Sequence, residues 1–164
     1  MQPKYFIAAI TLLPFTGSAE NPSFGDWEVD LSAATVMTEA FTENSSGSLF
    51  GLVCIVSDNN CVFYISSQTT CEEGSSSLVL INTEAGALTT QIDCLALNDT
   101  NYNIIRETDA VHDAVTSSKT IGIALPMHSG QFKVVRFSLV GSNAAIEKAA
   151  QRALDSRQLG DQFL

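Results

Sequence analysis

The stretch Leu49–Ser67, which reads LFGLVCIVSDNNCVFYISS, decides the fold class of this chain. Its two halves, Leu49–Ser57 and Cys61–Ser67, are rich in β-branched and aromatic residues, and they flank the polar residues Asp58-Asn59-Asn60. Two such runs on either side of turn-forming residues predict a β-hairpin.

The same alternation of strand and turn continues on both sides of this hairpin. Glu84-Ala85-Gly86 and His128-Ser129-Gly130 each separate two further apolar runs, so two more hairpins are expected. Near the N-terminus, Trp27, Val29 and Leu31 alternate with acids, as in a half-buried strand. Besides the first hairpin, strands are expected at Phe24–Leu31, Val36–Thr42, Leu78–Thr83, Ala87–Leu97, Tyr102–Arg106, Thr120–Met127 and Gln131–Val140. Closely spaced strands without βαβ alternation predict a mainly β fold, an antiparallel β-sandwich or a strongly bent sheet.

Two segments change to the helical period. Asp109–Ser118 predicts a short helix whose first turn is capped by Thr108 or Asp109. A C-terminal helix is expected from an N-cap at Ser142 to about Ser156. Its narrow, alanine-rich apolar stripe suits close packing against the sheet core, and consists of Ile146, Ala149, Ala150, Ala153 and Leu154.

Residues 1–19, MQPKYFIAAITLLPFTGSA, are typical of a secretory signal peptide. Lys4 precedes an apolar run from Tyr5 to Phe15, and Gly17 and Ala19 suit a cleavage site after Ala19. The run is too short to span a bilayer, which needs about 20 residues. We therefore expect a signal peptide (1–19), a single β-rich domain (20–157), a C-terminal tail (158–164), and a periplasmic or secreted bacterial protein without a membrane span.

An even number of cysteines in an exported chain indicates disulfides, and this chain has Cys54, Cys61, Cys71 and Cys94. Their spacing lacks the close pairs that zinc sites use. Cys54 and Cys61 face each other if the first hairpin turns near Ser57-Asp58, and Cys71 then pairs with Cys94. The alternative is a pair of longer bridges.

The charge is acidic and unevenly distributed. The chain has 18 acids, 8 basic residues, a net charge of −10 and 45% hydrophobic residues, which argues against disorder and against binding to nucleic acid. Between Glu20 and Ile105 there is no Lys or Arg against twelve acids. This asymmetry indicates either solubility or an acidic face for a basic partner or for divalent cations.

The chain lacks the familiar catalytic motifs, including the nucleophile elbow, the phosphate loop and the dinucleotide fingerprint. Its histidines, His112 and His128, have no His or Cys at ligand spacing, so exposed structural roles are expected. Asp26, Glu28 and Asp30 share one face of the first strand, where weak divalent cation binding is the alternative to a solvated surface. We predict no catalytic residue, no cofactor and no dedicated metal site.

Two segments resemble the invasion-associated locus B proteins. Phe24-Gly25-Asp26-Trp27-Glu28-Val29 is similar to that family's opening F-G-D-W strand. Phe137-Ser138-Leu139-Val140-Gly141, followed by Ala144-Ala145-Ile146, is similar to its closing S-L-x-G-F-x-x-A element, although Ser142 replaces the Phe. The family's cysteine soon after the Trp is replaced by Leu31-Ser32-Ala33. The layout is also similar to small periplasmic proteins associated with type VI secretion.

The resemblance implies a small, exported, β-rich protein with an envelope or host-interaction role. We therefore expect an envelope-associated binding module that is not an enzyme and that has a protein partner. One alternative is a periplasmic inhibitor or immunity protein that blocks a basic enzyme cleft, which an acidic patch beside an apolar groove would favour. Another is a small exported hydrolase, which a deep pocket with two facing titratable groups would favour.

Overall fold

A computed structural model describes residues 21–58, 60–66, 71–97, 100–127 and 129–161. The expected signal peptide lies outside these residues. Within them, ten strands form one antiparallel sheet in the order β1-β2-β3-β4-β5-β8-β7-β6-β9-β10. The elements are β1 (Ser23–Phe24), β2 (Trp27–Asp30), β3 (Met37–Glu43), β4 (Leu49–Ile55), β5 (Asn60–Ser66), β6 (Ser76–Thr83), β7 (Gly86–Leu97), β8 (Thr100–Ile105), α1 (Thr108–Thr116), β9 (Thr120–Pro126), β10 (Phe132–Ser138) and α2 (Ser142–Asp161).

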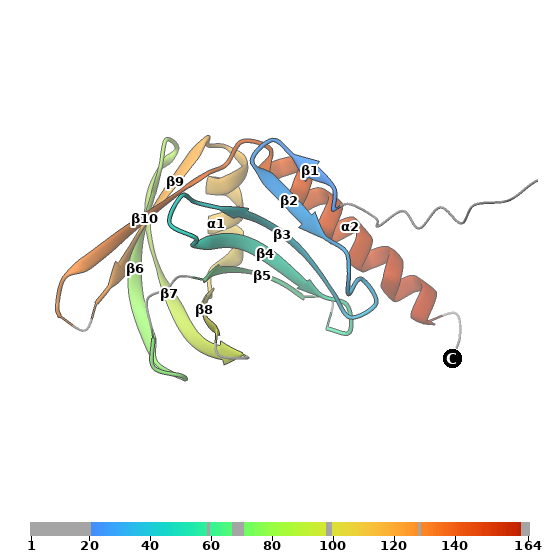
Figure 1. The fold of residues 1–164 in the computed structure, drawn as a ribbon, viewed down its shortest axis with the longest axis horizontal. Coiled ribbons are helices and arrows are strands. Elements are labelled where there is room, and N and C mark those ends of the chain that lie inside the picture. The colour runs from blue at the N-terminus through green and yellow to red at the C-terminus, as the bar shows by residue number, and fades with distance from the viewer. Residues whose placement is uncertain (1–20, 59, 67–70, 98–99, 128, 162–164) are drawn as a thin grey trace, which may run out of the picture.

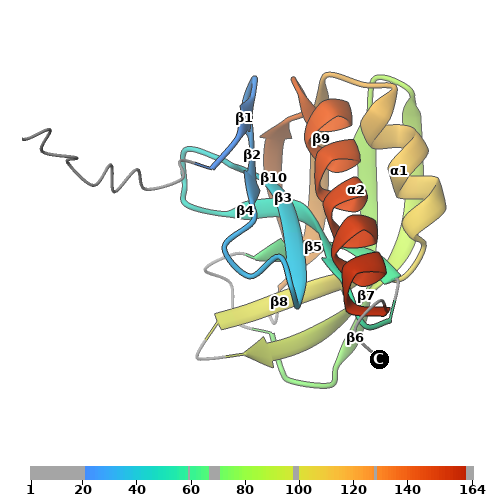
Figure 2. The ribbon, with the colours of Figure 1, turned by 90° about the vertical axis from the view of Figure 1, so that its right-hand side faces the viewer.

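The sheet bends so strongly that its two ends meet, as Figures 1 and 2 show. The rings of Phe50 on β4 and Phe137 on β10 lie 5.6 Å apart, although these strands are far apart in the strand order. Of the two expected architectures, the chain therefore adopts the bent sheet, with one core on its inner face. The mainly β fold with a short helix and a C-terminal helix is confirmed.

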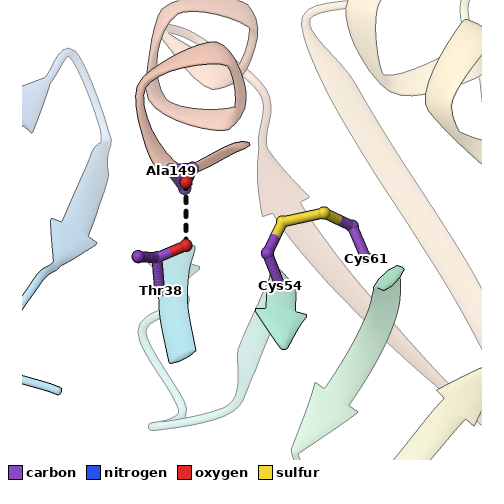
Figure 3. The surroundings of a disulfide bond; sticks show 4 residues. All are labelled: Thr38, Cys54, Cys61 and Ala149. Carbon is purple, nitrogen blue, oxygen red and sulfur yellow. Dashed lines mark hydrogen bonds between the residues drawn. A yellow bond between two sulfur atoms is a disulfide. The ribbon is translucent and has the colours of Figure 1, made fainter. Parts of the chain in front are cut away.

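Helix α2 packs across β2, β3 and β4 and covers their inner face (Figure 2). The alanines of its stripe bring the backbones so close that the Thr38 hydroxyl on β3 donates a hydrogen bond to the Ala149 carbonyl, at 2.8 Å (Figure 3). Ile146 and Ala153 are buried as expected, but Leu154 is 43% exposed. The helix also runs beyond Ser156 to Asp161, because Arg157, Gln158 and Leu159 are good helix formers.

The first expected strand, Phe24–Leu31, is interrupted. β1 and β2 are separate strands that pair as a tight hairpin, with Phe24 opposite Trp27. Gly25 makes the turn possible because it has a φ of 62°, in the left-handed region. Beyond the turn the predicted alternation is confirmed, since Trp27 and Val29 are fully buried and Glu28 is exposed.

Both predicted helix caps are wrong. The N-cap position of α1 is Glu107 rather than Thr108 or Asp109, and no side chain caps it. The Ser142 hydroxyl donates a hydrogen bond to the carbonyl of Val115 on α1, at 3.3 Å. Ser142 thus links the two helices in the core, where a buried hydroxyl needs an acceptor.

The sheet closes where the turn after β1 meets the end of β10. The Trp27 indole donates a hydrogen bond to the Ser138 carbonyl, and the Asp26 backbone N–H donates one to the Val140 carbonyl, both at 2.9 Å. The Ser138 hydroxyl donates a third to the Asp26 carboxylate, at 2.6 Å. We call these contacts the closing junction.

Two glycines permit this approach. Gly141 has a φ of 93°, and a Cβ atom there would lie 1.7 Å from the Phe24 carbonyl oxygen. A Cβ atom on Gly25 would lie 2.6 Å from the Val140 carbonyl oxygen. The two segments that resemble the invasion-associated locus B proteins are therefore the two sides of one structural junction.

Candidate functional site

The outer face of the sheet, away from the helices, carries an uncovered apolar region over β6, β9 and β10. Strand register places Leu80 beside Ala124, Ala124 beside Val134, and Pro126 beside Phe132. Four large side chains in this region are between 48% and 67% exposed. We define the outer apolar surface as Leu78, Leu80, Ala124, Pro126, Phe132 and Val134. Contiguous exposed apolar regions are uncommon on monomeric proteins and indicate interaction sites.

A shallow hollow of about 390 Å³ lies at one end of this surface. Gly122 and Ala124, which carry little or no side chain, line it together with Leu80 and Val134. Arg136 and Glu84 bring charge to the same end. The hollow could receive an apolar side chain of a partner, with polar contacts at its edge.

Glu84 is fixed at this end by the start of β9. Its carboxylate accepts hydrogen bonds from the Thr120 hydroxyl at 2.7 Å, the Thr120 N–H at 3.2 Å and the Lys119 N–H at 3.1 Å. These bonds, chiefly that of the Thr120 hydroxyl, lower the pKa of Glu84 to about 2. The group therefore carries its negative charge at any physiological pH.

The outer apolar surface was not predicted from the sequence, although the sequence of β6 contains a signal for it. In β6, Leu78 and Leu80 alternate with Val79 and Ile81, so both faces of the strand are apolar. Such strands usually lie in sheets that are covered on both sides. Here only the inner face is covered, because Val79 and Ile81 are buried in the core, whereas Leu78 on the outer face remains 67% exposed.

The four candidate cysteines form two disulfides, Cys54–Cys61 and Cys71–Cys94. Cys54 and Cys61 are directly opposite in the β4–β5 hairpin, which turns about Ser57-Asp58. Figure 3 shows this bridge beneath α2, close to the Thr38–Ala149 hydrogen bond. The second bridge ties the segment before β6 to β7.

The three acids that were predicted to share one face of the first strand, Asp26, Glu28 and Asp30, do not all lie on one strand. Glu28 and Asp30 lie on β2, but Asp26 belongs to the turn, where it accepts the Ser138 hydrogen bond. His112 is exposed on α1, and His128 lies outside the described residues. Among the residues that the structure describes, no three His, Cys, Asp or Glu side chains are placed to hold a metal ion.

A second group of acids occupies the outer face of β2 and β3. Register places Glu28 beside Phe41 and Asp30 beside Glu39, with Glu43 farther along β3. Glu39 accepts a hydrogen bond from the Tyr64 hydroxyl. Burial, partly offset by this bond, raises the pKa of Glu39 above its ordinary value. We call Glu28, Asp30, Glu39 and Glu43 the acidic region.

A third feature is a pocket of about 300 Å³ on the inner side of the sheet, next to the Cys71–Cys94 disulfide. Among the described residues that line it, Glu72 is the one titratable side chain. In the parts of the chain that the structure covers, no helix combines the length and the apolar character that crossing a membrane requires.

Comparison with known proteins shows a relationship of fold. The crystal structure of invasion associated protein B from Bartonella henselae aligns with a TM-score of 0.56 and 12% sequence identity, over 80% of this chain and 96% of the other. No protein-family description and no curated protein sequence matches the chain. The similarity is therefore one of architecture.

Proposed function

We propose that this protein is an exported, noncatalytic module that binds another protein through the outer apolar surface. The observation that carries the proposal is the contiguity of Leu78, Leu80, Phe132 and Val134, each about half exposed or more, across three paired strands. Burial of such side chains on association supplies the main favourable free energy of binding. The charged groups at one end, Arg136 and Glu84, would fix the orientation of the partner.

Export to the periplasm or beyond the cell is part of the same proposal. The sequence of residues 1–19 supports it, and so do the two disulfides, because disulfides persist in oxidising compartments.

We also infer membership of the invasion-associated locus B family. The two resembling segments and the shared fold support this inference. The solved neighbour is named as an invasion associated protein, and for this chain that name suggests a role at the bacterial envelope.

The acidic region favours a second candidate function, the inhibition of an enzyme with a basic cleft. Asp30 is opposite Glu39 in the β2–β3 register, Glu28 lies on the same face opposite Phe41, and Glu43 extends the negative charge along β3. Such a region would attract a basic partner at low salt.

Affinity capture with surface variants tests the proposal. The tagged, oxidised protein is incubated with periplasmic extract, as wild type and as Leu80→Ser, Phe132→Ser and Val36→Ser. Val36 is a matched control because it is 63% exposed and lies outside the outer apolar surface. Exposed substitutions of this kind change stability by about 0.5 kcal/mol or less, so binding is tested separately from folding.

We expect a partner that wild type and Val36→Ser retain and that Leu80→Ser and Phe132→Ser lose. Retention by all four proteins would contradict the proposal. Loss in a Glu28→Gln/Glu43→Gln variant, with retention in Phe132→Ser, would favour the inhibitor function.

A further inference from the structure

Strand β10 forms one edge of the sheet, because β9 is the one described strand that pairs with it. The opposite edge is β1, which is only two residues long. Figure 1 shows β10 at the margin of the ribbon, with β9 alongside. An edge strand presents backbone N–H and C=O groups that can pair with another chain, so the exposed part of β10 is a candidate binding element.

The backbone groups of β10 alternate between β9 and the open side of the strand. The Gln131 carbonyl accepts a hydrogen bond from the Met127 N–H, at 2.8 Å. At the other end, the Leu139 N–H donates one to the Lys119 carbonyl, at 2.7 Å. The odd-numbered residues of β10 therefore bond to β9. The N–H and C=O groups on the open side belong to Phe132, Val134, Arg136 and Ser138.

The two halves of this open side differ. The closing junction covers the end of β10, and the Arg136 carbonyl accepts a hydrogen bond from the Asn44 side-chain amide, at 3.2 Å. Among the residues that the structure describes, none forms a hydrogen bond with the open-side backbone groups of Phe132 or Val134. The first half of β10 therefore presents backbone donors and acceptors that a further strand can bond.

The side chains of this half also lack the usual protection of an edge. Natural sheets protect exposed edges with charged side chains, prolines or bulges. Phe132 and Val134 are instead apolar, 65% and 50% exposed, and both belong to the outer apolar surface. β10 pairs with β9 residue by residue from Phe132 to Ser138, without a bulge.

We propose that an extended segment of the partner protein adds to the first half of β10 as an antiparallel strand. An extended backbone is the structure that complements the N–H and C=O groups of an open edge, and the strand pairs of this sheet are all antiparallel. The inference rests on the proposed function, because it describes how the partner reaches the outer apolar surface.

The face of β10 determines the side chains that this segment needs. Residues opposite Phe132 and Val134 would extend the outer apolar surface, so they should be apolar. Arg136 is the next exposed residue on the same face, and no described carboxylate forms an ion pair with it. An acidic residue opposite Arg136 would supply one. In antiparallel order, the segment therefore reads acidic, any, apolar, any, apolar.

A second copy of this chain fits the edge less well. β10 contains no acidic residue, so pairing two β10 strands would leave Arg136 without a carboxylate from the opposite strand. Each chain also carries a net charge of −10, so two copies repel each other. These charges favour a different protein as the source of the added strand.

A titration followed by NMR tests the inference. The probe is the blocked peptide acetyl-GTETVTVT-amide, which in antiparallel pairing places its glutamate opposite Arg136 and its valines opposite Val134 and Phe132. One control peptide has the reverse order, and a second has serine for both valines. A third is N-methylated at the valine opposite Val134, so it lacks the N–H that would bond to the Val134 carbonyl.

The oxidised, isotope-labelled protein gives two readouts. Hydrogen exchange of the Val134 backbone amide reports on the edge, and the Val134 methyl resonances report on the face. The Val135 amide is the internal reference, because it belongs to the odd-numbered residues that bond to β9.

We expect the probe peptide to bind saturably and to slow exchange of the Val134 amide by about tenfold or more, because the added strand accepts its hydrogen bond. The serine and N-methylated peptides should bind about fivefold or more weakly, since each lacks one part of the pairing. The reversed peptide should also bind more weakly, because its glutamate lies away from Arg136.

A proline variant tests the edge in the protein itself. Val134→Pro removes an N–H that points away from β9, and edge strands tolerate proline at such positions, so the variant should fold. It should lose the peptide, whereas Val134→Ser keeps the N–H and should still show slowed exchange at saturation. If Val134→Pro does not fold, the N-methylated peptide makes the same test on the wild-type protein.

The partner capture described above separates this inference from the proposed function. A partner that Leu80→Ser loses and folded Val134→Pro retains would overturn strand addition and leave the outer apolar surface as the binding site. A partner that Leu80→Ser retains and Val134→Pro loses would support strand addition and contradict the proposed function.

Four results would overturn the inference. They are no saturable binding of the probe peptide, methyl shifts of Val134 without slowed exchange of its amide, equal binding of the N-methylated peptide, and self-association of the wild-type protein that Val134→Pro abolishes. The last result would assign the edge to a second copy of the chain.

Discussion

Replacing Gly141 with alanine should destabilise the protein far more than a glycine-to-alanine change at an open position. Gly141 has a φ of 93°, where an L residue is strained by about 1–2 kcal/mol. The new Cβ would also lie 1.7 Å from the Phe24 carbonyl oxygen, so the closing junction must separate. Separation would break the hydrogen bonds that Trp27 and Asp26 donate, each of which contributes about 1 kcal/mol to the stability of the folded state. The expected loss is about 3–4 kcal/mol, which is large against total stabilities of about 5–15 kcal/mol.

Gly74→Ala is the matched control. Gly74 has a φ of 76°, but no described atom lies within 4 Å of its hypothetical Cβ. Gly74→Ala should therefore lower the free energy of unfolding only by the backbone strain that the alanine introduces, about 1–2 kcal/mol. The difference between the two variants measures the closing junction alone.

Urea unfolding of the oxidised proteins provides the measurement. Trp27 is the single tryptophan of the chain and belongs to the junction, so its fluorescence reports on the closure, while circular dichroism reports on the whole sheet. If Gly141→Ala loses no more free energy of unfolding than Gly74→Ala, the junction does not hold the sheet closed and the reasoning is wrong.

Three further predictions concern the core and the charged groups. Trp27→Ala should cost about 3–5 kcal/mol in urea unfolding because the side chain is fully buried, whereas Glu28→Gln on the outer face should change stability by less than about 0.5 kcal/mol. Ile146→Asp should lower the free energy of unfolding by more than about 3 kcal/mol, because it places an unpaired carboxylate against the sheet. Asn143→Asp, at an exposed position of the same helix, should leave the melting temperature unchanged, and the same result for Ile146→Asp would show that α2 does not belong to the core. The pKa of Glu84 is lowered from 4.5 to about 2, so the hydrogen bonds of its carboxylate stabilise the folded state above about pH 4.5, and this stabilisation is lost as the pH falls toward 2. Glu84→Ala should therefore have a lower melting temperature than wild type at pH 7, and the difference should shrink between pH 4.5 and pH 2.

Local patterns predicted the strands well because period-two alternation reports directly which side chains face the core. Trp27 and Val29 follow it. The Cys54–Cys61 pair depended on the position of the turn, because the hairpin turns about Ser57-Asp58 rather than about the expected Asp58-Asn59-Asn60. The turn at Gly25 was missed because a two-residue turn interrupts the strand without interrupting the apolar pattern on either side.

The binding surfaces could not be predicted because they depend on which faces the helices cover. Leu78 and Val79 look alike in the sequence, yet Val79 is 1% exposed and Leu78 is 67% exposed. The cap assigned to Ser142 failed for a similar reason, since the carbonyl of Val115 that accepts its hydrogen bond is distant in the sequence. Local helix propensity cannot predict that a hydroxyl will bond to a carbonyl that only the tertiary fold brings close.

Site-specific photo-crosslinking in living cells tests the central claim most directly. A photoreactive phenylalanine analogue replaces Leu80 in the outer apolar surface, Val36 outside it, or Glu43 in the acidic region, and all three side chains are exposed. We predict one discrete crosslinked protein from position 80 and none from positions 36 and 43. Crosslinks from position 43 alone, or equal crosslinking at all three positions, would contradict the assignment of binding to the outer apolar surface.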